Sequence, residues 1–385
     1  MGMIYFDNAA TTWPKPASVR ERAVGFFKDY GANPGRSGHA MSMDTAQQVY
    51  RCREEAAALF GVSDPARVVF TQNCTHGLNQ ILYGVLREGD HLLISDLEHN
   101  SVCRPAYRLA KERKIRLDIV TTFLGDDDAT VEAFARAIRP ETRMILVTHC
   151  SNVFGFRLPV ERLAQLAHRY HVLMAVDAAQ SAGVLPIDVE GDGFDYVAMP
   201  GHKGLYGPTG TGLLLIGKDA PPLHPLLVGG TGSLSRSFEQ PDTLPDLLES
   251  GTINTFGILG LSAGIRFVRR VGINQIADHE AALAAHLQKH LRQIPGIHVI
   301  GEEKALQFAA PVLSFLIEGQ TGEETAQLLS EKGFALRGGL HCAPLAHRKM
   351  GTLECGTARI GLGYFNTLQQ AKALVHAVCG AAKVR

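Results

Sequence analysis

The feature that most constrains this chain is the regular alternation of short apolar segments with longer amphipathic segments between residues 45 and 176. Parallel strands need a long crossover, usually a helix, to connect them. The alternation therefore predicts an α/β fold in which a mainly parallel sheet is covered by helices on both faces. The predicted strands are Arg67–Thr71, His91–Ser95, Arg116–Thr121, Arg143–Thr148 and Val172–Val176. The predicted helices are Thr45–Leu59, Thr75–Leu86, Ser101–Arg113, Ala129–Ile138 and Val160–His168.

The second half of the chain follows a different pattern. Phe194–Ala198 and Gly212–Gly217 predict two further strands, and a Gly/Pro/Ser-rich loop, Pro221–Pro245, follows them. A loop of that length is more often functional than not. A long predicted helix, Thr255–Val271, leads to a C-terminal α+β segment from about residue 272, and we place a domain boundary within that helix.

Composition excludes several kinds of partner. The 385-residue chain is 45% apolar and 20% charged, as in ordinary globular proteins, and its 38 basic and 38 acidic side chains balance. Without a basic run, we expect neither nucleic acid nor an anionic membrane as a main partner. No apolar segment reaches the length of a membrane span, and residues 1–7 lack the pattern of a secretory signal. The seven cysteines form no CxxC pair, which predicts reduced thiols and a cytoplasmic protein.

Two segments place an acid and an amine where a ligand would bind. Asp177 ends an apolar strand, and Lys203 lies on a glycine-bounded turn after the strand Phe194–Ala198. In an open α/β sheet, ligands bind outside the carboxyl ends of the strands. A neighbouring acid and amine suit a cofactor that carries a cationic ring nitrogen and an aldehyde, and pyridoxal phosphate carries both. The pair therefore predicts a pyridoxal-phosphate enzyme.

Other residues near these two have types that suit the same cofactor. A lysine that attacks an aldehyde must be neutral, so burial or positive charge should lower the pKa of Lys203, and neighbouring His202 fits. Asp177 would keep the ring nitrogen protonated, Gln180 would bond the ring hydroxyl, and His99 would stack on the ring. The plainer alternatives are a helix cap for Asp177, a solvated loop lysine for Lys203 and a surface turn for His99. Together, the residues favour the cofactor.

A phosphate site is predicted where Thr71–Gly77 joins a strand to a helix. Backbone N–H groups and the helix dipole attract phosphate there, and Thr75 adds a hydroxyl. In isolation the plainer interpretation, a threonine helix cap, would be favoured. The phosphate interpretation gains weight from Asp177 and Lys203.

Four segments together resemble the cysteine desulfurase and selenocysteine lyase group of class-V aminotransferase-fold enzymes. They are Phe6–Thr12, Asp177–Ser181, Gly201–Lys203 with Tyr206–Gly210, and Arg337–Ala343. The resemblance runs nearly end to end and implies the fold type I of pyridoxal-phosphate transferases. It implies a homodimer with active sites at the subunit interface, cysteine or selenocysteine as substrate, and a sulfur-acceptor protein. It also implies an N-terminal segment 1–15 that packs with the small domain, a large cofactor-binding domain 16–258, and a small domain 259–385 that carries the thiol loop.

The same resemblance implies roles for individual residues. Lys203 would hold the cofactor and act in catalysis, Asp177 and Gln180 would bind its ring, and His99 would stack on the ring and act in catalysis. The implied phosphate ligands are Thr75, His76, His202 and, from the other subunit, Thr252. The implied substrate-binding residues are Asn8, Ala10, His39, Asn152, Arg337 and Arg359, of which Arg359 would pair with the substrate carboxylate. Many relatives carry serine where this chain has Pro200, so one phosphate donor is lost.

Cys342 lies in a Gly-rich, Pro-bounded loop after a predicted strand, Phe334–Arg337, and the residue types of the loop suit a mobile, accessible thiol. Arg337 and His341 lie close in sequence, and cationic neighbours lower the pKa of a thiol. The resemblance makes Cys342 the catalytic nucleophile that takes sulfur from L-cysteine, leaving a persulfide and L-alanine. The short distance in sequence from Cys342 to Arg359 resembles the group with a more ordered loop. We expect the other cysteines to be ordinary buried residues.

Three alternatives stay open. A selenocysteine lyase would use every residue named above. Another class-V aminotransferase-type enzyme would need a keto-acid acceptor, and the motif around Cys342 argues against it. A non-catalytic protein with a metal site of His341, Cys342, His347 and Cys355 matches no zinc spacing and leaves Asp177 and Lys203 unexplained, so we expect no metal.

Overall fold

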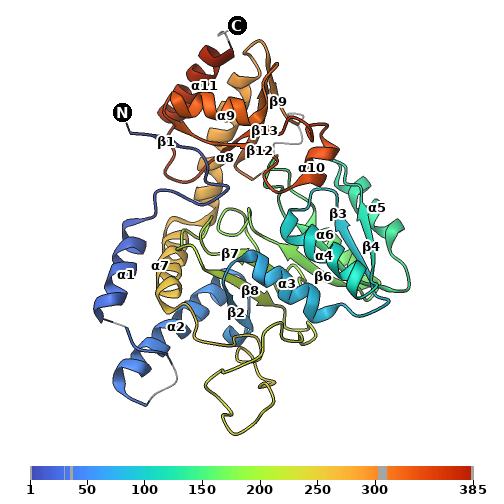
Figure 1. Ribbon diagram of the computed structural model, residues 1–385, viewed down its shortest axis with the longest axis vertical. Helices are drawn as coiled ribbons and strands as arrows, with labels where there is room; N and C mark the ends of the chain where they lie inside the picture. The colour runs from blue at the N-terminus through green and yellow to red at the C-terminus, as the bar shows by residue number, and fades with distance from the viewer. Residues whose placement is uncertain (1, 30, 35–37, 302–309, 383–385) are drawn as a thin grey trace.

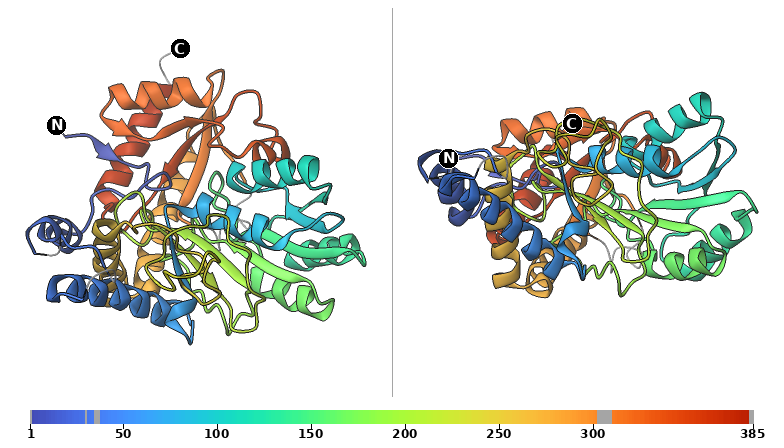
Figure 2. Two further views of the ribbon diagram at one scale, coloured as in Figure 1. Left: turned by 60° about the horizontal axis from the view of Figure 1, so that its bottom comes forward. Right: turned by 90° about the horizontal axis from the view of Figure 1, so that it is seen from below.

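The computed structural model describes residues 2–29, 31–34, 38–301 and 310–382. Figure 1 shows two bodies, a larger one built on a wide sheet and a smaller one of C-terminal elements, in orange and red, above it. Figure 2 shows the same division from two further sides, with the N-terminal strand β1 lying against the smaller body.

The sheet of the larger body has seven strands in the order β2-β8-β7-β6-β5-β3-β4. Within it, β8 runs antiparallel to both of its neighbours, and the other strands run parallel to one another. The strands are β2 (Val68–Thr71), β3 (His91–Ser95), β4 (Arg116–Val120), β5 (Thr142–Thr148), β6 (Leu173–Asp177), β7 (Tyr196–Pro200) and β8 (Gly212–Ile216). The predicted α/β class with a mainly parallel sheet is confirmed.

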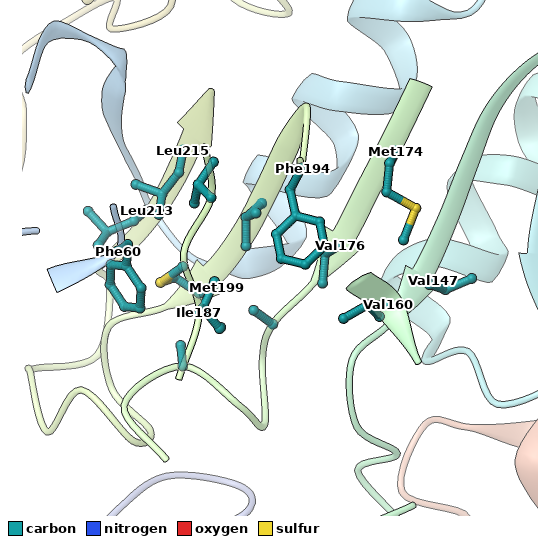
Figure 3. Close-up of a cluster of buried hydrophobic side chains, with 14 of the residues drawn as sticks. Phe60, Val147, Val160, Met174, Val176, Ile187, Phe194, Met199, Leu213 and Leu215 are labelled. Carbon is teal, nitrogen blue, oxygen red and sulfur yellow. The ribbon is translucent and has the colours of Figure 1, made fainter. Parts of the chain in front are cut away.

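Helices cover both faces of this sheet because successive residues of each strand point to opposite sides. On one face, α3 and α4 pack over residues such as Leu92 and Leu214. On the other face, α2, α5, α6 and α7 pack over residues such as Leu93 and Leu213, in the cluster that Figure 3 shows in part. The helices are α2 (Ala40–Leu59), α3 (Cys74–Val85), α4 (Asn100–Glu112), α5 (Asp127–Ala137), α6 (Val160–Arg169) and α7 (Thr255–Val271), with the 3-10 helix η1 (Pro65–Arg67) before β2.

The smaller body is an antiparallel sheet in the order β12-β13-β10-β9 with helices packed against it. Its core includes Leu287, Phe315 and Leu374. Helix α10 lies apart from that core and joins the core of the larger body through Ala346. The elements are α8 (Ile273–Leu291), β9 (Ile297–Val299), β10 (Val312–Ile317), α9 (Gly322–Glu331), β12 (Arg337–Gly339), α10 (Pro344–Lys349), β13 (Thr357–Gly361) and α11 (Leu368–Ala382).

The N-terminal segment connects the two bodies. Strand β1 (Ile4–Tyr5) pairs in parallel with β11 (Phe334–Ala335), and Asp7 forms an isolated bridge with Gly361 of β13. A Cβ on Gly361 would lie 2.5 Å from the backbone nitrogen of Ala9, so the crossing needs glycine there. The chain then returns to the larger body, where α1 (Ala17–Asp29) packs on α7. Segments from both ends of the chain therefore meet between the two bodies.

The structure departs from the predicted elements in a few places. Helix α2 begins at Ala40 rather than Thr45, because the side chain of His39 accepts a hydrogen bond from the backbone N–H of Ser42. The predicted strand Phe334–Arg337 is two strands, since β11 pairs with β1 whereas β12 pairs with β13. The domain boundary at residue 258, which we placed within the long helix, lies in α7 and stays a prediction. Across the described residues, we find no helix with the length and apolar character needed to span a membrane.

Candidate active site

The predicted strand ends meet at one cavity of about 230 Å³ at the carboxyl edge of the larger sheet. Asp177 is the last residue of β6, and Lys203 follows shortly after the end of the neighbouring strand β7. The cavity brings together most of the predicted site residues: Ala10, Thr75, His99, Asn152, Asp177, Gln180, His202, Lys203, Arg337 and Arg359. A sheet edge thus gathers side chains that lie far apart in the sequence.

Lys203 lies on a tight turn that only glycine permits. A Cβ on Gly201 would lie 2.2 Å from Oγ1 of Thr211, and a Cβ on Gly204 would lie 2.3 Å from the carbonyl oxygen of Ala182. Contacts that short would push the turn away from its neighbours. The glycines on either side of Lys203 therefore let the turn pack closely enough to bring the amine to the cavity.

The pKa of the Lys203 amine is lowered from 10.5 to about 8. Burial is the main cause, the Arg359 guanidinium adds to it, and Asp177 acts in the opposite direction. His202, to which the sequence analysis assigned this effect, is uncharged at neutral pH, because burial and two nearby lysines lower its pKa to about 4. The charge expected on His202 is therefore wrong, whereas burial, the other expected cause, does lower the pKa of Lys203.

Asp177 is 2% exposed and is held by two donors. Its Oδ1 accepts hydrogen bonds from the backbone N–H of Ala179 at 2.9 Å and from the thiol of Cys74 at 3.4 Å. Burial and the Asp177 carboxylate raise the pKa of the Cys74 thiol well above its ordinary value. Cys74 was expected to be an ordinary buried cysteine, but it lines the cavity and donates to Asp177, the residue predicted to pair with the ring nitrogen of the cofactor.

His99 and Gln180 are both fixed by the chain. His99 caps α4 with its side chain, and its Nδ1 accepts a hydrogen bond from the backbone N–H of Ser101 at 3.0 Å. Burial lowers the pKa of His99 to about 4, so its ring is neutral and carries its proton on Nε2. The Gln180 amide donates to the carbonyl oxygen of Ala9 at 3.1 Å. Because His99 caps α4, the sequence around it also fits the alternative of a turn residue with a purely local role.

The N-terminus of α3 opens into the same cavity. Its cap is Asn73, whose side chain accepts a hydrogen bond from the backbone N–H of His76 at 2.9 Å, so the alternative of Thr75 as the cap is wrong. Thr75 is exposed and lines the cavity. Among the described residues, no group bonds the buried Nδ1 of His202. A helix N-terminus, a hydroxyl and an unpartnered imidazole nitrogen suit a phosphate group.

Arg359 reaches the cavity from β13 and is 1% exposed. Its Nη2 donates to Oδ1 of Asp7 at 2.8 Å, and its Nη1 donates to the carbonyl oxygen of Asn152 at 3.0 Å. The Asn152 side-chain amide donates in turn to the carbonyl oxygen of His341 at 2.8 Å. Both residues predicted to orient the substrate are therefore already bonded to the chain, and Arg337 lies directly opposite Arg359 on β12.

Cys342 is exposed and lies beside the cavity rather than in its lining. It lines an adjoining cavity of about 340 Å³ that shares Thr75, His99 and Ser101 with the first. The backbone N–H of Asn100 donates to the carbonyl oxygen of Cys342 at 2.7 Å. His341 and Cys342 have positive φ angles of 49° and 58°. Non-glycine residues adopt such angles at a cost, so contacts such as these must hold the thiol loop in place.

His341 does not supply the positive charge expected beside the thiol. Its Nε2 donates to the carbonyl oxygen of Thr357 at 3.0 Å, and burial with the nearby Arg359 lowers its pKa to about 2. The alternative metal site is not assembled either. Within the described residues, no three His, Cys, Asp or Glu side chains gather closely enough to hold a metal ion. His347 instead bonds Oγ1 of Thr352 at 2.8 Å.

Besides Cys342, four predicted site residues lie outside the cavity. Asn8 is buried between the two bodies, where its amide donates to Oδ1 of Asn366 at 3.1 Å. His39 caps α2. His76 and Thr252 line a separate cavity of about 200 Å³. Their roles in binding substrate and cofactor stay predictions.

The N-terminal segment forms a clamp on the lysine turn that no sequence pattern predicted. The Thr12 hydroxyl donates to the carbonyl oxygens of His202 and Lys203 at 3.1 and 3.0 Å, and the Lys15 ammonium donates to that of His202 at 2.7 Å. These contacts join residues about 190 positions apart in the sequence, so only the fold reveals them. The N-terminal segment is therefore part of the site.

Glu98 is a further residue near the site that no sequence pattern predicted. It is fully buried, and its Oε1 accepts a hydrogen bond from the backbone N–H of Thr148 at 2.9 Å. Burial raises the pKa of Glu98 to about 8, so the carboxyl is mostly protonated at neutral pH. Glu98 connects the end of β5 to the turn that carries His99.

Comparison with known proteins agrees with this geometry. The family model described as Aminotransferase class-V matches residues 4–374. The chain belongs to the class-V aminotransferase family. It is 33% identical over 379 residues to a probable cysteine desulfurase of Methanothermobacter thermautotrophicus, covering 96% of this chain and 92% of that relative. A probable cysteine desulfurase of Mycolicibacterium paratuberculosis is 32% identical over 98% of this chain, which spans 55% of that longer relative.

A solved structure supports the same grouping within the family. The apo structure of a cysteine desulfurase from Thermococcus onnurineus NA1 matches with a TM-score of 0.91 and 29% identity, covering 99% of this chain and 95% of that one. The family predicted from the four motif segments is therefore confirmed.

Proposed function

We propose that this chain is a pyridoxal-phosphate-dependent cysteine desulfurase, which converts L-cysteine to L-alanine and takes the sulfur onto Cys342 as a persulfide. One observation carries the proposal. The amine of Lys203 and the buried carboxylate of Asp177 line one cavity, and the exposed thiol of Cys342 lies in the adjoining cavity. The cysteine desulfurases among its relatives support the same reaction.

The residues that line the cavity fit pyridoxal phosphate. Lys203 would hold its aldehyde carbon, and Asp177 would pair with its ring nitrogen. Thr75, the N-terminus of α3 and His202 would hold its phosphate, and a phosphate would give the buried Nδ1 of His202 the partner it lacks among the described residues. With Pro200 in place of serine, Thr75 and His202 remain as side-chain ligands from this subunit. When bound, the cofactor stores the electrons released at the substrate Cα.

The chain itself supplies the groups that bind the substrate and move its protons. Arg359 would bind the α-carboxylate. Lys203 would accept the Cα proton, because its pKa of about 8 lies close to neutral pH. His99, whose pKa is about 4, is the weaker base of the two.

Cys342 would perform the sulfur transfer. Its thiolate attacks Sγ of the substrate, so that an S–S bond forms while the bond between Cβ and Sγ breaks. The electron pair of the broken bond remains on the carbon side, and a proton completes the methyl group of L-alanine. The exposed position of the thiol would let a separate acceptor protein remove the sulfur.

The proposal includes a homodimer. Apolar side chains stand exposed on α2 and on the loop after β8, which projects below the larger body in Figure 1. They include Met41, Met43, Leu227, Val228 and Phe238. Exposed apolar groups of this kind favour a protein–protein contact. Thr252 follows the same loop, which supports its donation to the cofactor site of a second copy.

The seven cysteines are unpaired in the described structure, which supports a reducing compartment such as the cytoplasm.

The test compares Cys342→Ser with Cys379→Ser, a matched control on α11 of the smaller body. Wild-type protein with cofactor and a thiol reductant should release sulfide and L-alanine from L-cysteine in equal amounts. Cys342→Ser should keep the bound-cofactor absorbance and lose sulfide release, whereas Cys379→Ser should keep both. Full activity of Cys342→Ser on cysteine would exclude the persulfide step. Activity lost on cysteine but kept on selenocysteine would assign a selenocysteine lyase.

A further inference from the structure

Asp7 pairs with Arg359, the residue that the proposed function assigns to binding the carboxylate of the substrate. The guanidinium of Arg359 donates through Nη2 to Oδ1 of Asp7 at 2.8 Å and through Nη1 to the carbonyl oxygen of Asn152 at 3.0 Å. Its Nε is buried and has no hydrogen-bond partner within the described part of the chain. The Arg359 side chain is 2% exposed and that of Asp7 is 22% exposed. The cation is thus buried, while the carboxylate that pairs with it has access to solvent.

The backbone holds Asp7 in this place. Asp7 bridges to Gly361, two residues beyond Arg359 on β13, and the Tyr5 hydroxyl donates to the carbonyl oxygen of Asp7 at 3.1 Å. A surface ion pair between long side chains would lack such anchors. The contact between Asp7 and Arg359 is therefore part of how the N-terminal segment packs.

We propose that Asp7 is an internal competitor for the substrate carboxylate, which occupies Arg359 in the free enzyme and thereby sets the affinity for the amino acid. The inference rests on the proposed role of Arg359 in binding the α-carboxylate. A guanidinium pairs best with a carboxylate through two parallel N–H groups. Both pairs of parallel N–H groups on a guanidinium include Nη2, to which Asp7 is already bonded, so a carboxylate that binds through two such groups must share Nη2 with Asp7 or displace it.

The charges around Arg359 give this competition a physical reason. A buried cation without a counter-charge is costly, and Arg337 places a second positive charge directly opposite Arg359. Asp7 supplies the counter-charge while the site holds no amino acid. Once an α-carboxylate binds, two like charges share one guanidinium, so Asp7 weakens binding and helps the product leave.

The experiment measures binding to the holoenzyme by calorimetry, with L-alanine, the proposed product, and L-alaninamide, which lacks the carboxylate. Asp7→Asn keeps an oxygen that can accept from Arg359 but removes the competing charge. It should tighten L-alanine by at least about fivefold, within the usual range of coupling between sites, and leave L-alaninamide unchanged. Asp118→Asn is the matched control. It removes a carboxylate on β4 that pairs with Arg139 at 2.7 Å, and β4 is a different strand from the one that carries Arg359. That control should change neither affinity.

Three results would overturn the proposal: unchanged affinity for L-alanine in Asp7→Asn, weakened affinity, or equal tightening of both ligands. A purely structural role of Asp7 would change the affinities for both ligands by a similar factor. Asp7→Ser carries the same expectation if the asparagine variant does not fold. Failure of the proposed function looks different, because wild-type protein would then release no sulfide from L-cysteine or would bind L-alanine and L-alaninamide equally well.

Discussion

The lowered pKa of Lys203 predicts how cofactor uptake depends on pH. With an ordinary pKa of 10.5, about 0.03% of the amine would be neutral at pH 7, whereas a pKa of about 8 leaves about 10% neutral. Only the neutral amine attacks an aldehyde. At pH 7, uptake should therefore be on the order of 300-fold faster than an ordinary lysine would allow.

Arg359→Gln tests the electrostatic part of this explanation. The substitution removes the positive charge that helps to lower the pKa of Lys203, and it leaves Asp7 unpaired, which raises that pKa further. Both changes reduce the neutral fraction, by about tenfold for each unit that the pKa rises. Arg139→Gln is the matched control, because it breaks only an exposed pair with Asp118.

The assay follows the absorbance of pyridoxal phosphate as the apoprotein takes it up, from about pH 6 to about pH 10. The wild-type rate should rise about tenfold per pH unit until about pH 8 and then level off, and Arg139→Gln should behave alike. The rate for Arg359→Gln should level off at a higher pH. A wild-type rate that keeps rising to about pH 10 would refute the lowered pKa of Lys203. If the rate for Arg359→Gln levels off at the same pH as that of the wild type, the charge of Arg359 does not contribute to that pKa.

Two further predictions concern stability and thiol reactivity. Because burial raises the pKa of Glu98 from 4.5 to about 8, the folded protein keeps a proton that the unfolded chain loses, so the free energy of unfolding should fall as pH rises through that range. Glu98→Gln should reduce the slope of the free energy of unfolding against pH by up to about 1.4 kcal/mol per pH unit in urea titrations. An unaltered slope would show that Glu98 does not cause this pH dependence. Iodoacetamide should modify exposed Cys342 first, whereas buried Cys150, whose pKa is raised to about 12, should react only on unfolding. Peptide mass spectrometry checks this order, and equal rates would contradict it.

The order of the elements could be predicted because it depends on local patterns. Strand β3 and helix α7 have the predicted bounds, His91–Ser95 and Thr255–Val271, since each is an apolar segment between polar or glycine residues. Helix α1 was not predicted, because Val24 and Phe27 are exposed and blur the apolar stripe that marks a helix. Strands β11 and β12 were merged because the change of pairing partner leaves no mark in the sequence.

The site could be predicted only in part for the same reason. Asp177 and Lys203 were recognisable because each lies at a predicted strand end. The contacts of Arg359 with Asp7 and of Thr12 with His202 span 352 and 190 residues of sequence, and no local pattern announces them. The competition for the carboxylate site and the clamp on the lysine turn therefore became visible only in the fold.

By itself, the sequence determined the α/β class and the chemistry of the groups at the sheet edge, because these follow from residue types and their spacing along the chain. The family followed from the resemblance of four motif segments. Only the tertiary structure decided the charge of those groups. The lowered pKa of Lys203 was expected, but the contribution of Arg359 to it, the neutral state of His341 and the proton on Glu98 come from burial and from charges brought by distant segments. Desolvation and charge–charge interactions depend on distance in space, which the order of residues does not contain.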